Sequence, residues 1–520
     1  MDNRAFTRGP GGLGGGTLKK HSLIKLAGLV VAAALAFTGC GSGGSDGAVL
    51  GGNGSTVTGG GGTTTTTGTT GFGVTGGSLT GAFGGTGGSS GTGGITGGIT
   101  GGTGGNTGGS TGGNGFLGNV TPLTLGTGLD NPTAFTFLDI GGTEVQVFAT
   151  GYRNLATAGS GRLRAVLEDG VTIVDITDRN TASPVSFSSP FDILYYNNRT
   201  PNTPADDAIF MTVGFAAGVG QGAVIRVDNF SLVNNQIVAD FEILPVPTGA
   251  APPVNPSFMV GVSIGANDYV YFSESNTQPN GTIRRVNVNG SGNGDGIIFT
   301  GLAIPTGIAT NGSQLIICEG NGGVAGLVYA ADLQTNAPAP GSAPGPNTPN
   351  TPLREVIPTG DAETNINRPF MVVHDGENGF FLASGAVFPG TPALAGGFTS
   401  VGAANGRIRF ISNASAATTT PEAQLVVGGL NNAACIDASD ANDDGTAAVL
   451  FSDSLSGQGR VMRLLVNTNN IVPTNTPSVV QSDSTNVPFF VLIGNENLPV
   501  LLAMFNPFDS QQGIFRAYQP

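Results

Sequence analysis

The first residues of this sequence that suggest chemistry lie at 440–445, where DANDDG places Asp440, Asn442 and Asp444 in a DxNxDG pattern. Oxygens at this spacing are typical of the first half of a calcium-binding loop, because calcium binds carboxylate and amide oxygens. The pattern is incomplete, since its ninth and twelfth positions are alanine and phenylalanine. Asn, Asp and Gly also favour tight turns between strands. The segment is therefore a partial calcium site or a hairpin turn, and we favour the turn.

A second group of acids stands at the ends of similar apolar runs. The segments FSES, ICEG and FSDS end such runs and contain Glu274, Glu319 and Asp453, whereas a fourth, LASG, has no acid. If these runs are equivalent strands, their acids approach one end of the fold. Asparagines just before proline-led runs would approach the same end; they are Asn131, Asn255 and Asn367.

Carboxylates and amide oxygens that converge in this way suit a ligand or a hard cation, and calcium is the cofactor that they would hold. The alternative is that the acids are solvated or pair with recurring arginines. Those arginines are Arg164, Arg226, Arg284, Arg409, Arg463 and Arg516.

The N-terminal region predicts export. Residues 19–40 begin with three lysines, continue with a short apolar run and end in FTGC. The run is too short to span a bilayer, which needs about 20 apolar residues, so it is typical of a secretory signal. FTGC resembles the bacterial lipobox, which implies that Cys40 is lipid-modified and residues 1–39 are removed. The alternative is a buried helix that ends in an ordinary cysteine. We expect a chain lipid-anchored to the cell envelope, facing the periplasm or the cell surface.

Removal of residues 1–39 would leave a strongly acidic protein without lysine. It would contain 15 arginines and 33 acidic residues, a net charge of −18. Nucleic-acid binding needs a basic surface and is therefore excluded. Schiff-base chemistry and a P-loop both need lysine and are excluded too.

The remaining reactive side chains are few. His374 is the single histidine after residue 39, and no GxSxG motif provides a serine for it to activate, so it is expected to be structural or exposed. Cys318 and Cys435 fall in non-neighbouring repeats. We therefore expect two separate buried thiols, although an exported chain could pair them.

Composition divides the chain into two further regions. Residues 40–118 are almost entirely Gly, Thr, Ser and Asn and cannot bury enough apolar surface to fold, so they are expected to form a disordered linker. From residue 119 to 520, short β-branched and aromatic runs alternate with turn residues. This pattern predicts an all-β domain.

One unit recurs in residues 119–520, which predicts a β-propeller with seven blades, or alternatively six or eight. Each unit begins with an apolar strand near Pro132, Pro190, Pro256, Pro305, Pro369, Ala434 and Pro488. A later strand opens with a glycine at 161, 222, 281, 326, 406, 459 and 513. The last unit lacks a fourth strand, and NVTPLTL at 119–125 is expected to supply it and close the ring.

The segments at 269–288 (YVYFSESNTQPNGTIRRVNV) and 305–320 (PTGIATNGSQLIICEG) resemble NHL-repeat and gluconolactonase/regucalcin-like propellers. The resemblance implies a propeller fold. It also implies, for the lactonase type, a Glu/Asn/Asp metal site with an acidic base. Glu274, Glu319 and Asp453 would then be the catalytic acids.

Two functions follow. The first is a tethered, non-enzymatic binding module for an envelope protein, glycan or small ligand, because the sequence shows no standard pairing of a nucleophile with a general base. The second is a calcium-dependent lactonase-type hydrolase. We expect a monomer that reaches the membrane only through its lipid anchor.

Overall fold

The computed structural model describes residues 122–518 except 131, 152–160, 168, 198–206, 217–221, 246–250, 275–280, 291–295, 321–325, 334–346, 349–350, 386–405, 432, 440–444, 454–458, 484–486, 493–499 and 507–508. The predicted signal, Cys40 and the predicted linker lie outside this part of the chain. So do Asn131, Asp440, Asn442 and Asp444, whose predicted roles stay predictions. In the described part, no helix has the length and apolar character needed to cross a membrane.

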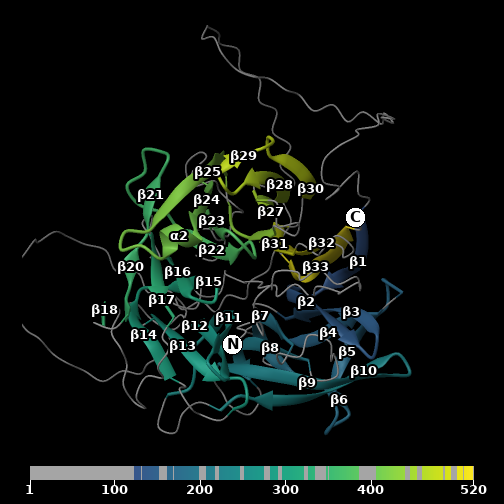
Figure 1. Ribbon diagram of the computed structural model, residues 1–520. Helices are drawn as coiled ribbons and strands as arrows, with labels where there is room; N and C mark the ends of the chain where they lie inside the picture. The colour runs from purple at the N-terminus through teal and green to yellow at the C-terminus, as the bar shows by residue number, and fades with distance from the viewer. Residues whose placement is uncertain are drawn as a thin grey trace, which may run out of the picture. The chain divides into compact units, whose positions relative to one another are not determined.

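The described strands pair into seven antiparallel meanders, which we call blades 1 to 7 (Figure 1). Blades 1 and 2 are β2 (Thr133–Ile140), β3 (Thr143–Thr150), β4 (Arg162–Val166), β5 (Ile173–Asp178), then β7 (Phe187–Tyr196), β8 (Ala208–Ala216), β9 (Ala223–Val233), β10 (Gln236–Ile243). Blades 3 and 4 are β11 (Pro256–Ile264), β12 (Asn267–Glu274), β13 (Gly281–Asn287), β14 (Gly296–Leu302), then β15 (Pro305–Thr310), β16 (Gln314–Gly320), β17 (Gly326–Asp332), β20 (Arg354–Glu355).

The later blades follow the same order. Blade 5 is β22 (Pro369–His374), β23 (Gly379–Ser384), β24 (Gly406–Ser412), β25 (Glu422–Leu430). Blade 6 is β26 (Ile436–Ser439), β27 (Thr446–Ser452) and β28 (Gly459–Asn467), with β29 (Val472–Pro473) and β30 (Ser478–Asp483) both on β28. Blade 7 is β31 (Val487–Leu492), β32 (Val500–Asn506), β33 (Asp509–Tyr518) and β1 (Pro122–Leu129). Short elements complete the fold: β6 (Ser183–Pro184), β18 (Asn347–Thr348), β19 (Thr351–Pro352), β21 (Ile357–Thr359) and α2 (Asn413–Ala416).

The first strands of the blades form a closed ring. Each contacts the next in the order β2, β7, β11, β15, β22, β26, β31, and β31 returns to β2. The ring closes as the sequence predicted, because β1 pairs antiparallel with β33 and supplies the outer strand of blade 7. The predicted all-β propeller fold is therefore confirmed.

Two outer-edge pairings were not predicted. The outer strands of blades 1 and 2, β5 and β10, run parallel and join both blades into one sheet. The predicted fourth strand of blade 4 divides after Glu355, because β20 pairs with β17 whereas β21 pairs in parallel with β25 of blade 5. These pairings cover edge backbone groups that would otherwise be open to other chains.

The recurring proline and glycine have one physical explanation. The glycine that opens a third strand packs against the proline that opens the next blade's first strand. A Cβ placed on Gly222, Gly281 or Gly326 would lie 2.3, 2.3 or 2.2 Å from the Cδ atom of that proline. Real Cβ atoms do not approach other atoms so closely, so glycine is required where successive blades meet.

The turns between first and second strands confirm the hairpin signals. In IGGT, Gly141 and Gly142 have φ values of 63° and 90°, and Ile140 pairs with Thr143. Residues 440–445 occupy the same place in blade 6, since β26 ends at Ser439 and β27 begins at Thr446. Residues 440–444 lie outside the described part of the chain, so the choice between a hairpin turn and a partial calcium site stays a prediction.

Apolar side chains fill the ring and the spaces between blades. Phe258 of blade 3 and Phe370 of blade 5 meet edge to face across the ring, with ring centroids 6.2 Å apart. Cys318 and Cys435 are both buried and form no disulfide with each other, which confirms the prediction of two separate thiols. Burial raises the pKa of Cys435 to about 11 and raises that of Cys318 well above its ordinary value, so both stay protonated at neutral pH.

Candidate functional site

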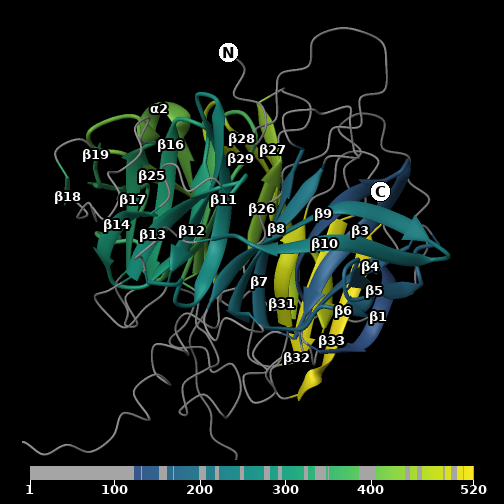
Figure 2. The same ribbon diagram turned by 90° about the horizontal axis from the view of Figure 1, so that it is seen from below.

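One end of the ring carries the predicted strand-end acids Glu274, Glu319 and Asp453. Here second strands end, third strands begin, and the fourth strand of one blade leads into the first strand of the next. We call this end the loop-bearing face. In the edge-on view of Figure 2 the blade strands run from this end of the ring to the opposite end.

Glu274 ends β12 and is 2% exposed. Its carboxylate accepts hydrogen bonds from the backbone N–H of Val254 and the hydroxyl of Thr282, and pairs with Nε of Arg284 at 2.5 Å. Arg284 also donates to the carbonyl of Ala251 at 2.6 Å. Because Ala251 and Val254 lie in the segment that enters β11, this acid fastens the entry segment of its own blade.

Asp453 has the same role in blade 6. It follows β27, is 3% exposed, and accepts a hydrogen bond from the backbone N–H of Asn431 at 2.7 Å. Asn431 lies in the segment that enters β26. The other carboxylate oxygen of Asp453 forms an ion pair with Arg460.

Glu319 repeats the arrangement in blade 4 with one difference. Its carboxylate accepts a hydrogen bond from the backbone N–H of Ala303 at 3.0 Å, just before β15. It also accepts a hydrogen bond from the hydroxyl of Tyr329, which stands in place of an arginine. Burial raises the pKa of Glu319 in spite of these two hydrogen bonds. The pKa of Tyr329 is raised to about 12, first by burial and then by the negative charge of Glu319.

The three predicted acids therefore occupy equivalent positions, but each uses its oxygens inside its own blade. Two of them pair with arginines, as the alternative interpretation of the sequence required; the partner of Asp453 is Arg460 rather than Arg463. Among the described residues, no three His, Cys, Asp or Glu side chains gather closely enough to hold a metal ion.

Two of the predicted asparagines are described. Asn255, directly before Pro256, has a φ of 50°, and Arg368, directly before Pro369, has a φ of 45°. This left-handed conformation is disfavoured for a residue that precedes proline, so both entry segments hold a strained backbone. The other described asparagine, Asn367, donates from Nδ2 to Glu363 at 3.1 Å.

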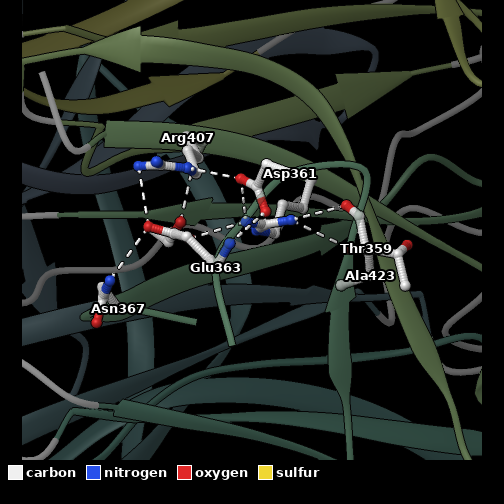
Figure 3. A network of polar contacts seen from close by, with 8 residues as sticks. Thr359, Asp361, Glu363, Asn367, Arg407 and Ala423 are labelled. Atoms are coloured by element: carbon white, nitrogen blue, oxygen red, sulfur yellow. Dashed lines mark hydrogen bonds and ion pairs between the residues drawn. The ribbon is translucent and has the colours of Figure 1, made fainter. Parts of the chain in front are cut away.

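Glu363 belongs to an ionic cluster in blade 5 that the sequence did not predict (Figure 3). Arg409 is fully buried and donates from Nη2 to Asp361 at 2.7 Å and to Glu363 at 2.8 Å. Arg407 pairs with the same two acids at 2.9 and 3.1 Å. The signal for this cluster was present in GRIRFI, but its partners lie more than 40 residues earlier, in the segment that enters β22.

The cluster also lowers the pKa of Asp361. Burial alone would raise the pKa of Asp361, but hydrogen bonds from Arg409 and Arg407 outweigh it, so the pKa lies below its ordinary value. Because its folded-state pKa is lowered, Asp361 stabilises the fold at pH values above its unfolded-state pKa. This contribution is lost as the pH falls through its folded-state pKa.

His374 lies at the opposite end of the ring and is half-buried. Its Nδ1 accepts from the N–H of Gly376 at 3.1 Å, so Nε2 carries the proton and donates to Oδ1 of Asn413 at 3.1 Å. Asn413 also accepts from Asn311 of blade 4 at 2.9 Å. The histidine thus supports Asn413, whose Oδ1 also receives the hydrogen bond from blade 4, and this hydrogen-bonded place fits a structural residue.

No family model matches the sequence, and no curated protein matches it. Solved structures are similar in fold. A PL25 ulvan lyase bound to a saccharide has a TM-score of 0.44 and 10% identity over 77% of this chain and 96% of its own. The Dos1 propeller has a TM-score of 0.41 and 10% identity over 77% and 95%. A putative 6-phosphogluconolactonase from Bacteroides uniformis has a TM-score of 0.38 and 12% identity over 68% and 90%. These similarities extend to the fold alone.

Proposed function

We propose that this chain is a non-enzymatic β-propeller binding module, held at the cell envelope by its N-terminal segment, which takes a protein, glycan or small ligand on the loop-bearing face. The observation that carries the proposal is what the carboxylates of Glu274, Glu319 and Asp453 bind. Each acid binds the backbone N–H of its own blade's entry segment. A calcium-dependent lactonase would need these same oxygens for its metal and its base.

The centre of the ring supports the same proposal. Phe258 and Phe370 are 2% and 3% exposed and meet across the ring, so apolar side chains fill its interior at that level. A ligand is therefore expected to lie across the rim of the ring rather than in a deep channel. Buried acids fix the entry segments of blades 3, 4 and 6, and a scaffold held in this way suits recognition.

Substitutions on the two ends of the ring test the binding face. Val254 is 38% exposed and Asn365 is exposed, and both lie in entry segments on the loop-bearing face. Ser313 is exposed in the turn between β15 and β16, at the opposite end. We expect Val254→Arg or Asn365→Arg to reduce capture of a partner from envelope extracts about tenfold, the loss typical of a disrupted interface residue, as measured by quantitative mass spectrometry.

Ser313→Arg is the matched control and should leave capture unchanged. Two face variants from different blades are used because a partner covers only part of the rim. Equal capture by all three variants, or equal loss with Ser313→Arg, would contradict the proposed face. Calcium that copurifies with the chain, together with lactone hydrolysis abolished by Glu274→Gln, would favour the hydrolase instead.

The proposed tether predicts a change of cell fraction. Cys40→Ser removes the residue that would carry the acyl chains, so we expect the chain to move from the membrane pellet to the soluble envelope fraction. Fractionation followed by immunoblotting measures this. A salt wash that does not release the unchanged chain is the control for simple electrostatic adsorption. Retention of Cys40→Ser in the pellet would contradict a lipid anchor.

A further inference from the structure

The three acids that fasten the entry segments differ in counter-charge. Glu274 pairs with Arg284, and Asp453 pairs with Arg460. The oxygens of Glu319 meet a backbone N–H and a phenol. Blade 4 therefore buries the same carboxylate without the cation that blades 3 and 6 supply.

Register shows how this difference arises. Arg284 and Tyr329 each stand three residues after the glycine that opens their strand. Arg284 lies opposite Phe272, two residues before Glu274, and Tyr329 lies opposite Ile317, two residues before Glu319. Tyr329 thus occupies the position of the arginine, and GLVYAA is the unit whose third strand has no arginine.

The charged groups around Glu319 do not replace that arginine. Across from Tyr329 in β20 lies Glu355, which is also acidic and acts on the tyrosine through its negative charge. Arg354 beside it forms two hydrogen bonds to Asp332, at 2.8 and 3.0 Å.

The two arginines of the preceding blade are engaged as well, and Arg284 pairs with Glu274. Arg285 of blade 3 lies 4.4 Å over the ring of Tyr269 and donates to the hydroxyl of Tyr271 at 2.9 Å. The groups that act on Glu319 are thus neutral donors, with a second negative charge behind them.

We infer that Glu319 makes blade 4 a pH-responsive part of the loop-bearing face, whose folded state is most stable when this carboxyl is protonated and is destabilised as the solution becomes more alkaline. A buried carboxylate costs stability unless a cation compensates it. The neutral carboxylic acid avoids that cost. It keeps an oxygen to accept from Ala303 and gains an O–H to donate to Tyr329.

The direction of the pH effect follows from linkage. Because the folded-state pKa of Glu319 is raised, the folded chain binds more protons than the unfolded chain above the ordinary carboxyl value. The stability that Glu319 contributes is therefore greatest at pH values below its unfolded-state pKa, and it is lost as the pH rises through its folded-state pKa. Asp361 in blade 5 acts in the opposite direction, since its pKa is lowered.

Glu319→Gln in the full chain tests the inference, because glutamine keeps the acceptor for Ala303 and removes the charge. At about pH 8 we expect its unfolding equilibrium constant to be several-fold smaller than that of the unchanged chain, since each unit of pKa shift corresponds to a tenfold change. The difference should shrink at acidic pH, because the native carboxyl takes up its proton as the pH falls through its raised folded-state pKa.

Glu274→Gln and Asp453→Asn are the matched controls. Both leave an arginine with a neutral partner, so both should destabilise the chain at either pH. Tyr329→Arg is a second, independent variant that supplies the missing cation and should flatten the difference between the two pH values. If Glu319→Gln destabilises the chain at about pH 8 as Glu274→Gln does, or if Tyr329→Arg leaves the pH dependence unchanged, the inference is wrong.

Discussion

A loss of about 3–5 kcal/mol in the free energy of unfolding is expected when Arg409 is replaced by methionine. The guanidinium of Arg409 is fully buried, and Nη2 alone serves both Asp361 and Glu363. Its Nη1 donates to the carbonyls of Thr359 and Ala423 at 3.1 and 3.3 Å. Methionine fills similar space but leaves these acceptors without their donor, and an unsatisfied buried acceptor costs more than a hydrogen bond contributes.

Arg407→Met is the matched control, because Arg407 pairs with the same two acids from a position with 19% of its side chain exposed. Water can replace its contacts, so a loss of about 1 kcal/mol or less is expected. Urea denaturation followed by fluorescence measures both variants. Equal losses for the two arginines would show that burial does not decide the strength of this cluster.

A second-site variant separates charge from packing. The triple variant Asp361→Asn, Glu363→Gln, Arg409→Met removes all three charges. It should recover part of the stability lost by Arg409→Met alone. Replacing both sides of a buried pair is often close to neutral, whereas removing one side is not. No recovery would mean that lost packing around residue 409 dominates.

Gly326→Ala is expected to destabilise the chain by about 3 kcal/mol, at the upper end of what overpacking costs. The new Cβ would lie 2.2 Å from Cδ of Pro369 and 2.7 Å from the carbonyl oxygen of Glu319. A proline ring and a backbone carbonyl have little freedom to move aside. Relief would therefore require blades 4 and 5 to separate where Gly326 meets β22.

Gly320→Ala is the matched control on the other side of the same loop. Its Cβ would have Thr306 Cγ2 as its nearest neighbour, at 3.6 Å, which is an ordinary contact. We expect a change within about 0.5 kcal/mol, measured in the same denaturation experiment. The double variant Gly326→Ala, Pro369→Ala should regain stability, because shortening the proline side chain makes room for the methyl group. Similar midpoints for Gly326→Ala and Gly320→Ala would contradict the packing explanation of the repeat.

Local sequence patterns predicted the fold well because its determinants are local. Alternating β-branched and aromatic residues produce strands, and IGGT and GAND produce turns, whatever surrounds them. The strand at 119–125 was assigned to blade 7 by counting, since one unit lacked a fourth strand, and β1 does pair with β33. The division of residues 353–359 between two blades was missed because both halves have the same strand-forming composition.

The sequence predicted where the strand-end acids lie but not which residues they contact. Glu274, Glu319 and Asp453 do stand at equivalent strand ends, as the alignment of FSES, ICEG and FSDS required. Whether such an acid faces a metal, a ligand or an arginine depends on segments distant along the chain. Asp361 and Glu363 show the same limit, since no local pattern connects them with Arg409.

The sequence by itself determined an all-β propeller closed by its own N-terminal strand and two separate buried thiols. These features depend on side-chain period, turn residues and repeat spacing. Only the tertiary structure decided that the recurring glycine and proline meet between blades and that the strand-end acids fasten entry segments. It also placed Tyr329 beside Glu319 where an arginine stands in blade 3. The physical reason is that burial and charge pairing are set by residues brought together across blades, which spacing along one strand does not encode.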